Sequence, residues 1–140
     1  MTPSGKNIKL IGEHILQNYI IVFFGAGIGG MLRYWGSNFV YKFLPPTFPY
    51  GTLSVNVLGS FIIGLVMYYL DANKLINQET RIFLTVGFCG GLTTFSTFAY
   101  ETINFIKERE YFYAGLNSLL NLFLTLIALF IAYKISKLIS

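Results

Sequence analysis

The sequence predicts an all-α membrane protein with four spanning helices. Mean hydropathy is +0.61 over the chain. Hydrophobic residues make up 54% of its 140 residues and charged residues only 11%, whereas soluble domains average about 25% charged residues. Four apolar stretches are separated by short polar segments, and each is close to the roughly 20 residues that cross a bilayer. We therefore expect a single multi-pass transmembrane domain.

The chain divides into a tail and that domain. Residues 1–18 are polar and carry charges of both signs. They lack a short apolar run followed by a small-residue cleavage site, so we expect a polar N-terminal tail and no signal peptide. The net charge of +4 lies mostly in the tail and loops, where it bears on topology and not on nucleic-acid binding. The transmembrane domain is expected at residues 19–137, with spans at about 19–40, 52–70, 82–105 and 111–133.

The segments between the spans predict the topology. Pro45, Pro46 and Pro49 end the first span, because proline breaks a helix interior, and Thr52 is expected to cap the second. Four spans place both termini on one side. Flanking Lys and Arg residues favour that side by six to three, a weak preference for cytoplasmic termini that leaves insertion in both orientations open. The six are Lys6, Lys9, Lys74, Arg81, Lys134 and Lys137, and the three are Lys42, Lys107 and Arg109.

Residues 87–98, with the sequence GFCGGLTTFSTF, differ from a helix that only contacts lipid. Their glycines weaken a helix, and we expect the third span to be broken near Gly90 and Gly91. Broken helices at membrane depth occur where they are buried in protein or line a cavity, and there they form ion and substrate sites. Four hydroxyl residues follow the glycines: Thr93, Thr94, Ser96 and Thr97.

Two other spans carry a polar face. Residues four apart share one face of a helix, and the second and fourth spans each place three polar residues at this spacing. A buried amide needs a hydrogen-bond partner, so these faces either join helices to one another or line a pathway, and the sequence leaves both open. The residues are Thr52, Asn56 and Ser60 in the second span, and Asn117, Asn121 and Thr125 in the fourth.

The inventory of charged and polar groups in the spans favours a small anion. Proton-coupled transporters and cation channels usually carry acidic side chains at membrane depth. Here Glu101, near the end of the third span, is the single carboxylate within the spans. Hydroxyl and amide donors suit an anion instead. Arg33 fits equally well as an interfacial anchor and as an anion attractor.

Phe95 and Phe98 are three residues apart and share a helix face. Aromatic ring edges are electropositive and attract anions, although ordinary packing is the alternative for such a pair. An unwound backbone also frees carbonyl oxygens, which coordinate Na⁺ in transporters. Because four short helices do not easily enclose a polar lumen, we expect a homo-oligomer, most simply a two-fold dimer.

Three motifs resemble the signatures of the Fluc (CrcB-type) fluoride channels: GAGIGGMLR at 25–33, GTLSVNVLGS at 51–60 and GFCGGLTTFSTF at 87–98. They occur in the family's order and on the corresponding spans, and the resemblance covers about residues 25–125. It implies an antiparallel, dual-topology homodimer with two fluoride pores and a structural Na⁺ at the centre of its interface.

The resemblance also implies roles for single residues. Phe95 and Phe98 match the phenylalanines whose ring edges face fluoride, Asn56 the pore asparagine, and Arg33 the arginine near the aqueous vestibule. Thr52, Ser96 and Thr97 match hydroxyls beside the pathway, Glu101 the glutamate of the third span, and Gly90 and Thr93 the carbonyls that hold Na⁺. The fourth span departs from the pattern, because Asn117, Asn121 and Thr125 occupy positions where a tyrosine or asparagine and then a serine are common.

The expected function is therefore that of a channel and not an enzyme: passive export of fluoride across the cytoplasmic membrane of a microbe. Two other functions remain open from the residues. A small proton-coupled multidrug antiporter also has four spans, but it needs a carboxylate embedded in the membrane. A non-transporting assembly subunit would use its polar faces only to join helices.

Overall fold

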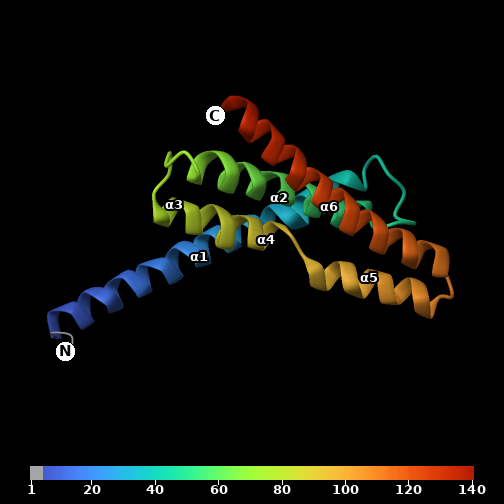
Figure 1. The fold of residues 1–140 in the computed structure, drawn as a ribbon. Helices are drawn as coiled ribbons and strands as arrows, with labels where there is room; N and C mark the ends of the chain where they lie inside the picture. Colours follow the sequence, from blue (N-terminus) through green and yellow to red (C-terminus); the bar gives the residue numbers. More distant parts are fainter. Residues whose placement is uncertain (1–4) are drawn as a thin grey trace.

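The computed structural model describes residues 5–140, with side chains from His14 onward, and these residues form a helical bundle (Figure 1). Four helical runs are long and apolar enough to cross a membrane: His14–Val40, Tyr50–Asp71, Gln78–Lys107 and Tyr111–Ile139. They confirm a multi-pass membrane protein. The elements are α1 (Gly5–Val40), α2 (Tyr50–Leu65), η1 (Val66–Asp71), α3 (Gln78–Ile82), η2 (Phe83–Cys89), α4 (Gly90–Leu92), α5 (Phe95–Lys107) and α6 (Tyr111–Ile139), of which η1 and η2 are π-helical.

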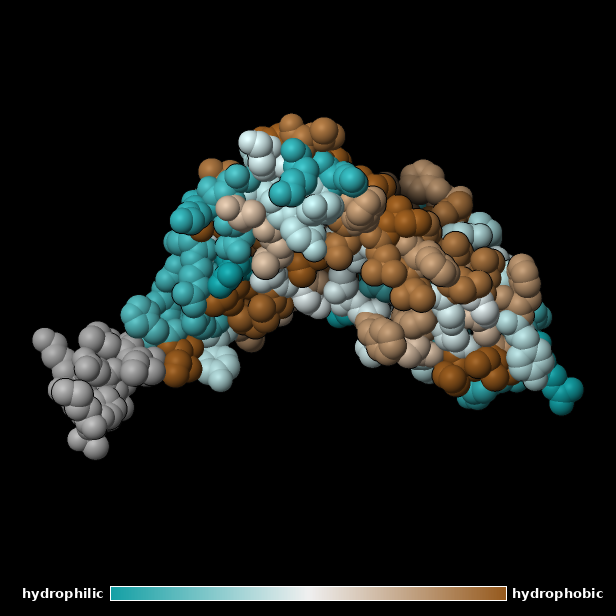
Figure 2. All heavy atoms as spheres, viewed as in Figure 1, coloured by the Kyte–Doolittle hydropathy of each residue, from teal (hydrophilic) through white to brown (hydrophobic). Residues whose placement is uncertain are grey.

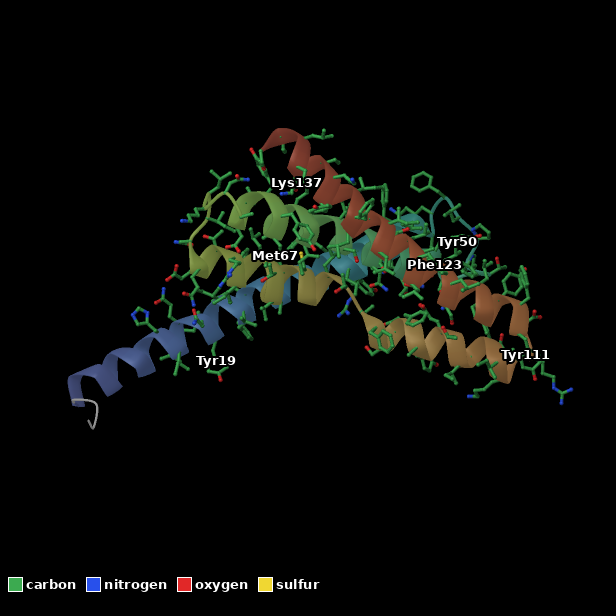
Figure 3. The ribbon with its side chains drawn as sticks, viewed as in Figure 1. Tyr19, Tyr50, Met67, Tyr111, Phe123 and Lys137 are labelled. Carbon is green, nitrogen blue, oxygen red and sulfur yellow. The ribbon has the colours of Figure 1, made fainter. Side chains whose placement is uncertain are left out.

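The two ends of the bundle are distinct. The C-terminus lies beside the turn before α3, where the amide Nδ2 of Asn73 donates to the hydroxyl of Ser140 at 2.9 Å. Figure 3 shows Lys137 at this end and Tyr50 and Tyr111 at the other. In Figure 2 hydrophobic residues cover most of the visible bundle, while hydrophilic ones gather toward its two ends. This distribution is the one expected for helices that cross an apolar layer.

Helix α1 begins at Gly5, so it runs through most of the segment expected as a polar N-terminal tail. The start of the second helix differs from expectation. Helix α2 begins at Tyr50, with Pro49 at its N-cap position, and no side chain caps it. The prediction that Thr52 caps α2 is therefore wrong: the helix starts directly after the last proline, and Thr52 already lies within its first turn.

Glycines bring α1 into close contact with η2. A Cβ atom added to Gly25 would lie 2.8 Å from the carbonyl oxygen of Phe83 and 2.9 Å from the Cα of Gly87. Gly29, one turn further, faces the backbone of Phe88 and Leu92 in the same way. Small residues four apart let two membrane helices approach to backbone contact, and this interface positions the first half of the third span.

Helical geometry in the third span stops at different residues from those expected. Gly90 and Gly91 are helical, in α4. The extended residues are Thr93, with φ −87° and ψ 157°, and Thr94, with φ −152° and ψ 117°. Thr94 also caps α5, because its hydroxyl oxygen accepts the N–H of Thr97 at 3.2 Å. In Figure 1 this short extended segment connects α4 to α5.

Candidate functional site

The extended backbone at Thr94 is held by one side chain from α2. The N–H of Thr94 donates to Oδ1 of Asn56 at 2.8 Å, and Nδ2 of Asn56 donates back to the carbonyl of Thr94 at 3.2 Å. In an uninterrupted α-helix the same N–H would donate to Gly90. Asn56, only 8% exposed, therefore replaces a helical bond with a bond across the bundle.

A chain of hydrogen bonds continues from Asn56 through α6 to α5. Nδ2 of Asn56 donates to Oδ1 of Asn121 at 3.0 Å, and Nδ2 of Asn121 donates to Oδ1 of Asn117 at 2.9 Å. Nδ2 of Asn117 then donates to the hydroxyl of Thr102 at 2.9 Å, and that hydroxyl donates to the carbonyl of Phe98 at 2.9 Å. Asn117 is fully buried. The polar faces of α2 and α6 thus join three helices.

Beside this chain lies a groove of about 630 Å³, open on one side. Among the described residues that line it none is charged, and the polar ones offer hydroxyl, amide and backbone groups between apolar walls. It brings together seven of the predicted site residues: Asn56, Gly90, Thr93, Phe95, Phe98, Asn121 and Thr125. The other six, which do not line it, are Thr52, Ser96, Thr97, Arg33, Asn117 and Glu101.

Phe95 and Phe98 border the groove directly after the extended segment. Their ring centroids lie 5.3 Å apart and their planes meet at 61°, so the rings pack edge to face. Phe95 is 78% exposed in the single chain. Packing within this chain therefore does not account for its position, and an electropositive ring edge remains available to a ligand or to a neighbouring molecule.

Hydroxyl groups at the start of α5 form a second small network. The hydroxyl of Thr94 donates to that of Thr97 at 3.0 Å and lies 3.2 Å from that of Ser96. Ser96 and Thr97 are exposed and do not line the groove. In α6, Thr125 donates to its own helix, at the carbonyl of Asn121, at 2.6 Å. Its hydroxyl hydrogen is therefore already used within α6.

Arg33 lies beside the extended segment, although the groove does not include it. Its Nη1 donates to the carbonyl of Thr93 at 3.2 Å. This bond fastens α1 to Thr93, next to the Thr94 backbone that Asn56 holds from α2. The fixed charge of Arg33 is therefore placed next to the end of α4 and is half-buried.

Glu101 belongs to a separate place, one and a half turns along α5 from Phe95. The hydroxyl of Thr52 donates to Oε1 of Glu101 at 2.6 Å, while Oε2 is buried with no hydrogen-bond partner within the described part of the chain. Thr52 thus joins the first turn of α2 to α5, nearer to the turn between α1 and α2 than the Asn56–Thr94 contact is.

Sequence reasoning missed two residues that hold the site together. Thr94 was noted only as one of four hydroxyl residues after the glycines. Its backbone N–H and carbonyl bond to Asn56, and its hydroxyl caps α5. A threonine followed by a helical run is an N-cap signal, and this signal was sufficient to find it. Thr102, the acceptor for Asn117, has no such signal, because its partner is fifteen residues away on another helix.

The residues also bear on which metal ions the site could hold. Among the described residues, no cluster of three or more His, Cys, Asp or Glu side chains is placed to hold a metal ion. Carbonyl oxygens at the end of α4 are the other candidate ligands in this region, and such oxygens suit a hard cation.

Comparison with known proteins places the sequence in a defined group. Residues 20–133 match the family model described as CrcB-like protein, Camphor Resistance (CrcB). A protein of Campylobacter jejuni named fluoride-specific ion channel FluC is 42% identical over 123 residues, which are 88% of this chain and 100% of that protein.

Two further relatives carry the same name. The Geobacter metallireducens protein is 52% identical over 99 residues, covering 71% of this chain and 79% of its own length. The Geobacter sulfurreducens protein is 47% identical over 107 residues, covering 76% of this chain and 86% of its own length. These matches confirm the resemblance that the three motifs indicated.

Proposed function

This chain belongs to the CrcB-like protein family, and on that premise we propose that it is a fluoride-specific channel that lets fluoride leave the cell passively across the cytoplasmic membrane. The relatives' names supply the ion. The observation that carries the proposal is the edge-to-face pair of Phe95 and Phe98 beside an uncharged groove whose lining includes hydroxyl and amide groups. Ring edges and hydroxyl or amide donors both favour an anion over a cation.

The residues that border the groove support passive conduction. A transporter driven by protons requires a carboxylate or histidine that gains and loses a proton along the pathway. Among the described residues that line the groove there is none, and Glu101, which does not line it, is engaged with Thr52 elsewhere on α5. The multidrug antiporter is therefore disfavoured for the same reason.

The second wall of the pathway would come from another copy of the chain. The groove is open on one side, and Phe95 beside it is largely exposed. An isologous two-fold dimer covers such a face on both subunits at once. We propose an antiparallel dimer, because the six-to-three distribution of flanking charges is a weak orientation signal that permits both insertions.

The carbonyls of Gly90 and Thr93 would hold a structural Na⁺ at the interface of that dimer. The α-helical donor to Gly90 would be the N–H of Thr94, but this group is bonded to Asn56 instead, so the Gly90 carbonyl lacks that donor. The Thr93 carbonyl accepts from Arg33 and keeps a second lone pair. Two carbonyls are too few for a Na⁺ site, and a two-fold axis would supply two more.

The proposed function is tested by ion efflux from proteoliposomes that contain only this protein, measured with a fluoride electrode and, in parallel, a chloride electrode. We expect fluoride release without chloride release. Dimeric, folded protein that releases neither ion would refute the proposal and favour a non-transporting assembly subunit.

Sodium removal tests the proposed ion site separately. Exchange of all Na⁺ for N-methylglucamine should shift detergent-solubilised protein from dimer toward monomer, as measured by cross-linking yield, and added Na⁺ should restore the dimer. A cross-linking yield that is independent of Na⁺ from zero to 100-fold excess over protein would eliminate the structural ion.

A further inference from the structure

The direction of every hydrogen bond in the chain from Asn56 to Phe98 is determined at its two ends. At the start, the backbone N–H of Thr94 can only donate, so the atom of Asn56 that it meets is the oxygen. At the far end, the carbonyl of Phe98 can only accept, so the hydroxyl of Thr102 must donate to it. Each amide between them then has one possible orientation.

This orientation leaves Asn56 with no unused donor. A carboxamide has two N–H groups. One of them is bonded to the carbonyl of Thr94 at 3.2 Å and the other to Oδ1 of Asn121 at 3.0 Å. An anion in the groove therefore gains a hydrogen bond from Asn56 only if one of these two acceptors gives way.

The two acceptors are not equally able to move. The carbonyl of Thr94 belongs to a backbone that Asn56 also holds through the Thr94 N–H, so releasing it would loosen the segment between α4 and α5. Oδ1 of Asn121 is at the end of a side chain that borders the same groove. Rotation of that side chain frees one N–H of Asn56 and disturbs no backbone bond of α2 or α5.

We propose that the carboxamide oxygen of Asn121 is a built-in substitute for the anion: it occupies the N–H of Asn56 that an anion takes over as it passes. This inference rests on the proposed function. A hydrogen bond to an anion is roughly twice as strong as one between neutral groups, so fluoride displaces Asn121 when present, and Asn121 returns to Asn56 when the anion leaves.

Asn117 and Thr102 set how readily this exchange occurs, as positioning residues. Nδ2 of Asn121 donates both to the backbone carbonyl of Asn117, at 3.1 Å, and to its side-chain oxygen, at 2.9 Å. Asn117 is in turn anchored by Thr102. The anchor holds Oδ1 of Asn121 against Asn56, which lowers the apparent affinity for the anion and keeps the buried amides paired between passages.

The sign of the effect on affinity separates this role from ordinary structural support. Loss of a structural residue weakens anion binding, whereas loss of a competing acceptor strengthens it. The variant Asn121→Ala should lower the apparent Kd for fluoride about threefold, the factor that corresponds to one average interhelical hydrogen bond in a membrane protein. The Kd is measured from the fluoride-dependent shift of the Asn56 side-chain resonance in protein labelled with ¹⁵N-asparagine, with chloride as the comparison anion.

Three further variants complete the experiment. Ser136→Ala is the matched control on α6, because its buried hydroxyl donates only to its own helix, at the carbonyl of Ala132, and its Kd should equal that of the wild type. Thr102→Val removes the anchor and should also lower the Kd, whereas Thr102→Ser keeps the hydroxyl and should restore the wild-type value. This pair decides the question if Asn121→Ala does not fold.

A Kd that is unchanged or higher in Asn121→Ala or Thr102→Val, in protein that remains dimeric, overturns the inference. So does a wild-type Asn56 resonance that does not respond to fluoride in protein that conducts fluoride. If the wild type passes no fluoride at all, the proposed function has failed by itself. The Asn56 resonance in fluoride-free buffer then still tests the bond, since Asn121→Ala must move it and Ser136→Ala must not.

Discussion

Replacement of Asn56 by leucine is the most informative single change, because this side chain makes three hydrogen bonds, two to the Thr94 backbone and one to Asn121. Leucine has a similar volume and suits an apolar bundle, so the change removes polarity with little effect on packing. The N–H and carbonyl of Thr94 and the oxygen of Asn121 all lose their partner.

The expected loss of stability follows from these bonds. Interhelical hydrogen bonds in membrane proteins average about 0.6 kcal/mol each, so three of them set a lower estimate of about 2 kcal/mol. The upper estimate is about 6 kcal/mol, reached if both backbone groups of Thr94 remain buried and unpaired at about 1–3 kcal/mol each. Asn56→Leu should therefore lower the free energy of unfolding by about 2–6 kcal/mol.

Equilibrium unfolding of the purified protein in mixed detergent and dodecyl sulfate micelles, followed by circular dichroism, measures this difference. Asn38→Leu is the matched control: Asn38 is exposed and donates only to the carbonyl of Tyr34 in its own helix, at 2.8 Å. It should change stability by less than about 0.5 kcal/mol. If Asn56→Leu also stays within that limit, Asn56 does not hold the segment between α4 and α5, and our account of the site is wrong.

Three further predictions concern other parts of the molecule. Phe95→Ile removes the electropositive ring edge and should reduce fluoride efflux sharply while the dimer cross-links normally; unchanged efflux would remove this ring from the pathway. Gly25→Ala places a methyl group against backbone atoms of η2 and should cost about 1–3 kcal/mol of unfolding free energy. Gly27→Ala is the control, because an added Cβ there meets nothing within 4 Å, and it should be neutral or stabilising. Equal effects of the two changes would contradict the close contact between α1 and η2. Thr52→Val removes the one hydrogen bond that the Glu101 carboxyl group accepts within the described part of the chain. It should cost about 1.5–3 kcal/mol of unfolding free energy, with Thr52→Ser close to wild type; the same unfolding assay decides both comparisons.

The sequence alone determined the spans and the family. Spans follow from hydropathy and from proline, both of which are local properties of the sequence. The prolines between α1 and α2 interrupt helical structure where expected. The family was evident because its motifs are runs of neighbouring residues, which need no knowledge of contacts.

The tertiary structure decided where the third span loses helical geometry and which polar residues meet. Glycine propensity favoured Gly90 and Gly91, but these residues stay helical because packing against α1 outweighs a local preference of about 1 kcal/mol per glycine. The helix ends at Leu92, and Asn56, thirty-eight residues before Thr94, takes the Thr94 N–H that would otherwise continue it. Helical spacing placed Asn117 and Asn121 on one face, yet only the crossing of α2, α5 and α6 determined that Asn121 meets Asn56 and Asn117 meets Thr102. Spacing along a helix defines a face, whereas the partner of that face depends on how the helices cross.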